Sequence, residues 1–150
     1  MKRYLIDTNL LLLFLRNDER WEKLNNQFDF GASRNYISAV SVGELESLAL
    51  QNNWGIKRME RLKDLTTVFA VIDINIDTII KQYAQIDAFS QGKLKDRPLS
   101  ISARNMGKND LWIAATAAAF QLELLTSDLD FDHLKNQFLT LHSIDIQNLI

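Results

Sequence analysis

Short apolar runs alternate along this chain with longer segments whose apolar residues recur at helical spacing. The runs that we expect to form strands cover residues 4–6, 35–37, 68–72, 124–126 and 138–141. Strands separated by helices pair in parallel, and the connecting helices then cover the faces of the sheet. The alternation therefore predicts an α/β fold with a central, mostly parallel sheet of about five strands.

Helical spacing predicts a helix from about residue 10, one around 21–28, one from Ser41 to about 52, one opened by Gly55 and one from 79 to near 92. A last helix over 111–120, capped by Asn109, is apolar almost all round and should be buried. The 150 residues contain no repeat, low-complexity segment or long linker. We expect residues 1–150 to form one domain.

The composition excludes several classes of protein. There are no cysteines, which excludes disulfides and thiolate metal sites, so a metal would need carboxylates or the two histidines. The apolar run at 10–15 is too short to cross a bilayer, and no signal-peptide cleavage site follows it. We expect a soluble cytoplasmic protein with no membrane contact.

Four carboxylates occupy equivalent places on the predicted scaffold. Asp7 directly follows the first strand, and Asp128 lies two residues after the fourth. Glu44 and Asp110 fall in the first turns of helices that start from the same edge, if the connections are right-handed crossovers. The carboxyl edge of such a sheet holds the ligand crevice, so all four acids could converge on one site.

Each acid also has a local interpretation. Asp7 and Asp128 could be turn residues, and Asp110 could be a first-turn acid favoured by the helix dipole. Glu44 could close a capping box with Ser41. Independent local causes do not explain why four acids share one edge, and Glu44 borders the apolar stripe of its helix whereas Glu46 faces away.

Like charges at short range repel one another, and a divalent cation removes the repulsion. Mg²⁺ and Mn²⁺ prefer oxygen ligands, and two such ions can activate water and stabilise the leaving oxygen of a phosphodiester. The chain has a net charge of −2, yet one segment carries five basic residues against one acid. These candidates for RNA binding are Lys93, Lys95, Arg97, Arg104 and Lys108. The same segment could instead be a solvated loop.

Four segments together resemble the motifs of PIN-domain ribonucleases, in particular the VapC-like toxins of type II toxin–antitoxin pairs. The segments are Leu-Ile-Asp7-Thr8-Asn9, Ser41-Val-Gly-Glu44-Leu, Asn109-Asp110-Leu-Trp-Ile-Ala-Ala-Thr-Ala and Leu-Leu-Thr126-Ser-Asp128-Leu-Asp130-Phe131. The resemblance covers nearly the whole chain. It implies a Rossmann-like three-layer fold and Mg²⁺- or Mn²⁺-dependent endonucleolytic cleavage of RNA.

The resemblance also implies roles for individual residues and partners. Asp7, Glu44, Asp110 and Asp128 would be the catalytic, metal-binding acids. Thr8 and Asn9 would shape the first turn, and Thr126 would offer a hydroxyl. Asp130 would be a supporting residue or the N-cap of the turn at Phe131. RNA would be the substrate, a small antitoxin protein the partner, and a homodimer the assembly.

Two other functions remain open from the residues alone. A phosphatase or phosphotransfer domain would use Asp7 as a nucleophile, although its usual second acid is replaced by Asn9. A non-catalytic module that binds RNA or protein could keep the same fold. We expect His133 to be a surface residue and Trp112 to lie in the core rather than to stack on bases.

Overall fold

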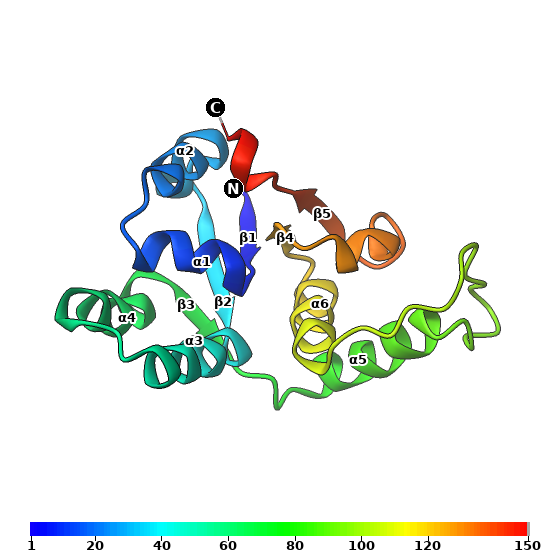
Figure 1. Ribbon diagram of the computed structural model, residues 1–150. Coiled ribbons are helices and arrows are strands. Elements are labelled where there is room, and N and C mark those ends of the chain that lie inside the picture. The colour runs from blue at the N-terminus through cyan, green and yellow to red at the C-terminus, as the bar shows by residue number, and fades with distance from the viewer. Residues whose placement is uncertain (150) are drawn as a thin grey trace.

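The computed structural model describes residues 1–149, whose strands form one five-stranded sheet with all neighbours parallel (Figure 1). The strands are β1 (Arg3–Ile6), β2 (Arg34–Ser38), β3 (Ala70–Ile72), β4 (Glu123–Thr126) and β5 (Thr140–Ser143). Their spatial order is β3-β2-β1-β4-β5. The first strand is therefore central, and the prediction of an α/β fold with a parallel sheet is confirmed.

Helices cover both faces of this sheet. They are α1 (Thr8–Leu15), α2 (Glu19–Phe28), α3 (Ala39–Asn52), α4 (Ile56–Val68), α5 (Asp77–Ser90) and α6 (Lys108–Phe120), with short 3₁₀ helices η1 (Phe30–Ala32), η2 (Leu129–Leu134) and η3 (Ile146–Asn148). In Figure 1, α1 to α4 lie on one side of the sheet and α5 and α6 on the other. The result is the three-layer architecture that the resemblance implied.

Alternating side chains of β1 enter two separate hydrophobic cores. Tyr4 and Ile6 pack with the α1–α4 layer, whereas Leu5 packs with the α5–α6 layer. All three are buried, as expected for a central strand covered on both faces. The strand can leave the interior only at its ends, and its carboxyl end is followed at once by Asp7.

Helix α6 is buried against α5 and the sheet, as its composition predicts. Ala114, Ala115 and Ala117 are fully buried, and their small side chains allow close packing. Trp112 is half-buried, and its ring lies 4.2 Å from that of Tyr83 between centroids. Its position in the core was therefore predicted correctly.

Several boundaries differ from the sequence-based expectation. Helix α1 begins at Thr8 because Asp7 caps it, and the cap of α6 is Gly107 rather than Asn109. Val68 ends α4 instead of opening a strand, and β5 begins only at Thr140. Strands β3 and β5 begin later in the sequence than expected because their first residues are set by pairing with neighbouring strands. Ala70 pairs with Tyr36 of β2, and Thr140 pairs with Glu123 of β4. Long-range pairing of this kind leaves little local signal.

Within residues 1–149, no helix combines the length and the apolar character needed to cross a membrane.

Candidate metal centre at the carboxyl edge of the sheet

The strand order reverses between β1 and β4. The chain moves outward from β1 through β2 to β3, then crosses back to place β4 on the other side of β1. In open parallel sheets the crevice at such a switch point is the usual ligand site. Asp7 follows β1 and Thr126 ends β4, so both lie at this point, as the sequence predicts.

Asp7 is almost completely buried, with 3% of its surface exposed. It caps α1, because one carboxylate oxygen accepts a hydrogen bond from the Thr8 N–H at 2.8 Å. The other oxygen accepts from the Thr126 hydroxyl at 2.6 Å. Burial raises the pKa of Asp7 to about 6 against the opposing effect of these two donors, and the charges of Glu44 and Asp128 raise it further. The Asp7 side chain therefore caps α1 and also lies among the candidate acids.

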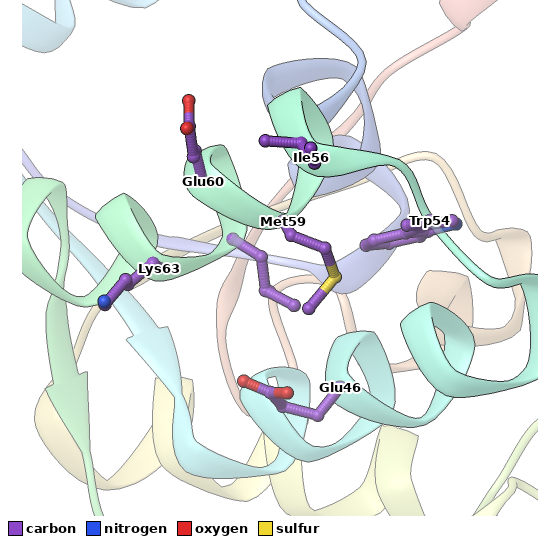
Figure 2. Close-up of a pocket in the computed structure, with 7 residues that line it drawn as sticks. Glu46, Trp54, Ile56, Met59, Glu60 and Lys63 are labelled. Carbon is purple, nitrogen blue, oxygen red and sulfur yellow. The ribbon is translucent and has the colours of Figure 1, made fainter.

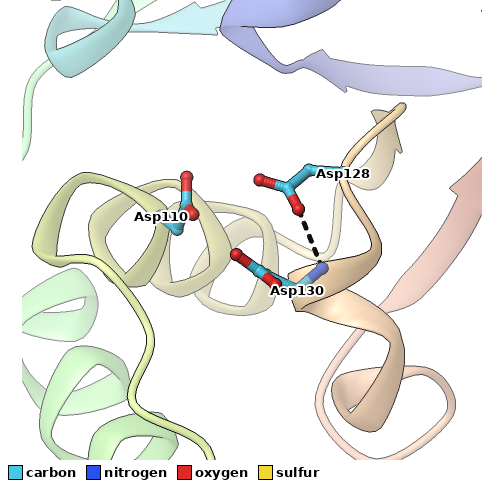
Figure 3. Close-up of side chains that lie close together, drawn as sticks. All are labelled: Asp110, Asp128 and Asp130. Carbon is cyan, nitrogen blue, oxygen red and sulfur yellow. Dashed lines mark hydrogen bonds between the residues drawn. The ribbon is translucent and has the colours of Figure 1, made fainter.

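Three aspartates lie close enough together to hold one metal ion (Figure 3). Asp110, Asp128 and Asp130 each offer a carboxylate oxygen, and these oxygens lie within 4.8 Å of one another. Asp110 comes from the first turn of α6, and the other two come from the start of η2. Asp128 caps η2 by accepting from the Asp130 N–H at 2.9 Å. Of the two roles expected for Asp130, the cap is therefore wrong, and its carboxylate lies in the acidic cluster instead.

The electrostatics of the cluster favour a cation. Burial raises the pKa of Asp110 to about 7, and the charges of Asp7, Asp128, Glu44 and Asp130 add to the increase in that order. All four predicted acids are therefore close enough to repel one another, as their positions in the sequence suggested. Carboxylate oxygens without Cys or His suit hard ions such as Mg²⁺ or Mn²⁺, so these residues fit the implied metal.

Glu44 enters the site from α3. The prediction that it lies in the first turn is wrong, because α3 begins at Ala39 with Ser38 as its cap and Glu44 falls in the second turn. The capping box with Ser41 is absent as well. Instead the Thr8 hydroxyl lies 2.8 Å from both Glu44 Oε1 and Ser41 Oγ. A carboxylate only accepts, so Thr8 donates its one proton to Glu44 and accepts from Ser41.

Ser41 is the residue that sequence reasoning misplaced. It is fully buried inside α3, where its hydroxyl supports Thr8. Its only sequence signal was the serine-to-glutamate spacing, which suggests a cap and not a tertiary contact.

Glu46 points away from the acids, as predicted. It lines a mostly apolar hollow of about 440 Å³ between α3 and α4, together with Trp54, Ile56 and Met59 (Figure 2). Of the four candidate acids, none lines this hollow. The two faces of α3 therefore line different surfaces, and of the two glutamates only Glu44 lies beside the other candidate acids.

The predicted supporting residues have distinct positions. Thr126 is fully buried, and its oxygen also accepts from the Asp128 N–H at 2.9 Å. Thr8 is buried as well, whereas Asn9 is exposed at the start of α1. Thr8 and Thr126 thus hold Glu44, Asp7 and the Asp128 backbone in place.

The five basic residues of the 93–108 segment have different surroundings. Arg97 lies over the ring of Phe138 at 4.3 Å and donates to the Gln137 carbonyl at 2.8 Å. These two residues precede β5, at the edge of the sheet opposite to the acids. Lys108 shares the first turn of α6 with Asp110, and Lys93 and Lys95 are exposed. Of the five, Lys108 therefore shares a helix turn with an acid of the cluster.

His133 is not the surface residue that the sequence suggested. It is half-buried, and its Nε2 lies 2.7 Å from the hydroxyl of fully buried Ser90. Burial lowers the pKa of His133, and the nearby charge of Arg104 lowers it further. The ring also stacks parallel to Phe89 with centroids 6.2 Å apart. These contacts tie η2, which carries two of the aspartates, to the end of α5.

Comparisons with known proteins bear on this arrangement. A family model described as PIN domain matches residues 4–137. No curated protein sequence matches the chain at a significant level.

Solved structures with the same fold include chains from several complexes. One comes from VapBC2 of Rickettsia felis bound to a promoter DNA fragment, at 19% identity and TM-score 0.73, covering 95% of this chain and 98% of that one. Another comes from FitAcB of Neisseria gonorrhoeae, at 23% identity and TM-score 0.71, covering 97% and 99%. A third comes from a toxin–antitoxin complex of Klebsiella pneumoniae, at 22% identity and TM-score 0.61, covering 85% and 89%.

Proposed function

This chain belongs to the PIN domain family, and we propose that it is an endoribonuclease that uses Mg²⁺ or Mn²⁺ to hydrolyse RNA phosphodiester bonds. Residues 1–150 would form the single PIN-like domain that does so. The observation that carries the proposal is the cluster of Asp110, Asp128 and Asp130 oxygens within 4.8 Å of one another. Nuclease activity is the general expectation for PIN domains of the VapC-like type.

Asp110, Asp128 and Asp130 would hold the ion, with Asp7 and Glu44 at its margin. A divalent ion bound there would polarise a phosphate oxygen and lower the pKa of a water molecule. Asp7 and Glu44 are already oriented by the hydroxyls of Thr126 and Thr8. Because the hydrogen bonds fix these carboxylates before any ligand arrives, little reorganisation would be needed on binding.

The raised pKa values of Asp7 and Asp110 add to this support. Without a cation, part of the population of both groups stays protonated near neutral pH. Cation binding would release those protons, since a metal ligand must be ionised. The chain would therefore bind metal more tightly at pH 8 than at pH 6.

RNA cleavage by substituted proteins tests the proposal. Asp7→Asn and Asp110→Asn should each lose cleavage of single-stranded RNA in Mg²⁺ or Mn²⁺ by at least about a hundredfold, while circular dichroism shows a folded protein. Asp64→Asn changes an exposed aspartate in α4 and serves as the control. Full cleavage by both site variants, or cleavage by the wild type in EDTA, would rule the proposal out.

The complexes that contain similar folds support the proposal of a toxin role and a protein partner. This chain would be the toxin of a type II pair, inhibited by a small antitoxin. Co-expression with a small protein encoded beside this chain should give a stable complex with suppressed cleavage, and the absence of any such complex would contradict the toxin role. The homodimer and the cytoplasmic location stay predictions, and light scattering of the purified chain tests the first.

The basic residues Lys93, Lys95, Arg104 and Lys108 are proposed to contact the phosphates of the RNA. Lys108 supports this best, because it begins the helix that carries Asp110. A lysine at that position can hold a phosphate next to the metal centre. Arg97 would act indirectly, by fastening the 91–107 segment to Gln137 and Phe138.

A further inference from the structure

A second feature adjoins the metal centre, on the side of Glu44. A cavity of about 500 Å³ lies between α1, α3 and the start of α6. Thr8 and Glu44 belong both to its wall and to the acid site, so the two spaces are continuous. Its size falls in the range of small-molecule pockets.

One whole face of α3 lines this cavity. Its residues recur at intervals of three and four, which places them on one side of the helix over three turns. They are Val40, Gly43, Glu44, Ser47, Leu48 and Gln51.

Gly43 stands in the middle of this face. Glycine inside a helix is costly for folding, and here no positive φ requires it. Apart from its chain neighbours and the backbone of its own helix, no heavy atom of the described residues lies within 4 Å of a Cβ placed at this position. The fold therefore has room for a side chain at residue 43, and leaving it out keeps the cavity open.

The chemistry of the walls suits an uncharged planar group. Asn9, Gln51 and Asn109 bring amides that both donate and accept hydrogen bonds, and Leu12 and Leu48 supply apolar surface. Among residues 1–149, no lysine or arginine lines the cavity. A phosphate would meet Glu44 with no compensating cation in this space, whereas the edge of an unpaired base would find partners in the amides.

We propose that this cavity binds one base of single-stranded RNA next to the bond that is cleaved, and that Gly43 keeps the space for it. The proposal rests on the ribonuclease function proposed for the acid site. It assigns base selectivity to Asn9, Gln51 and Asn109, and not to the basic segment at 93–108. The amides would select the base by its pattern of donors and acceptors, while Leu12 and Leu48 contact its face.

The experiment compares Gly43→Leu and Gln51→Ala with the wild type. Gly31→Leu is the matched control, because Gly31 is equally open and lies in η1, before β2, at the opposite edge of the sheet. A library of RNA decamers with randomised sequence is cleaved in Mn²⁺, and the fragment ends are sequenced. Binding of labelled decamers is measured separately in Ca²⁺, and melting temperatures report folding.

The wild type should show a base preference at one position beside the cleaved bond. Gly43→Leu should weaken binding and cleavage of preferred decamers by about tenfold or more, and Gln51→Ala should flatten the preference. Gly43→Ala should raise the melting temperature by about 2–4 °C, because alanine favours the helix. Gly31→Leu should leave both binding and selectivity unchanged.

Unchanged binding and base preference in Gly43→Leu and Gln51→Ala would overturn the proposal. The proposal would also be overturned if Gly43→Leu and Gln51→Ala lost affinity only for a protein partner, because the cavity would then hold a protein segment. The two proposals can also fail separately. If the wild type binds RNA selectively without cleaving it, the ribonuclease function fails. If Gly43→Leu and Gln51→Ala then lose that selectivity, the base-binding role of the cavity is retained.

Discussion

Ionisation of Asp7 and Asp110 lowers the stability of the folded protein. Both acids have a higher pKa in the folded protein than the ordinary 3.8, at about 6 and about 7. Their protonated forms are therefore favoured by folding, and their ionised forms are disfavoured. Asp18 shows the opposite case, because hydrogen bonds from Arg20 lower the pKa of this half-buried acid to about 2.

The free energy of unfolding should therefore fall as pH rises from 5 to 8 when divalent ions are absent. The stabilising contribution of each raised acid is complete below its unfolded pKa and lost as pH passes through its folded pKa. For Asp7 the loss between pH 5 and pH 8 is roughly 1.4 kcal/mol, because the rest of the change lies below this range. Asp18 is ionised throughout this range and does not alter the slope. Urea unfolding in EDTA at several pH values measures the effect.

Asp110→Asn should reduce this dependence on pH, since it removes the acid with the higher pKa and breaks no hydrogen bond that the structure contains among residues 1–149. Asp64→Asn should retain the full dependence. A wild-type stability that stays constant or increases from pH 5 to pH 8 would contradict the electrostatic description of the site.

At the level of single elements, the helix starts show what a local pattern can and cannot predict. Ser41 and Glu44 have the spacing of a capping box, yet Ser38 caps α3 by accepting from the Val40 N–H at 3.0 Å. Both serines lie near the start of the same apolar segment, so propensity alone does not show which one caps α3. The start of α3 is determined by β2. This strand continues to Ser38, which pairs with Ile72 of β3, so Ser38 is the residue that caps the helix.

Ser38→Ala should lower the free energy of unfolding by about 1 kcal/mol, the usual cost of losing a helix cap. Its local effect should be faster amide hydrogen exchange in the first turn of α3. Ser41→Ala leaves that cap intact and should change exchange around Thr8 instead, because it removes the hydroxyl that supports Thr8. Equal fraying of the first turn in both variants would mean that Ser41 does contribute to capping.

Over the whole molecule, the parallel sheet and the convergence of the four acids could be predicted from the sequence, because both follow from the order of apolar runs. The contacts between distant segments could not. Thr8 meets Ser41 across 33 positions and Thr126 meets Asp7 across 119. Neither pair leaves a trace in local spacing, and the same holds for His133 on Ser90 and for Arg97 on Phe138.

Divalent ions should stabilise the folded chain as a whole. An ion that binds only the native state at 100 times its dissociation constant adds about 2.7 kcal/mol to the free energy of unfolding. Thermal unfolding with Mn²⁺, and again after EDTA, measures this gain. KCl at matched ionic strength controls for screening of the acids. An equal gain in the Asp110→Asn protein would place the ion elsewhere.

The reversal of strand order also has a consequence during synthesis. Asp7 and Glu44 leave the ribosome early, but β4 pairs with β1 only after nearly the whole chain has been made. At about 5–20 residues per second, several seconds separate the exit of Glu44 from that of Asp128. An unfinished chain therefore has no complete set of acids, and the proposed ribonuclease site is not assembled until the final strands emerge.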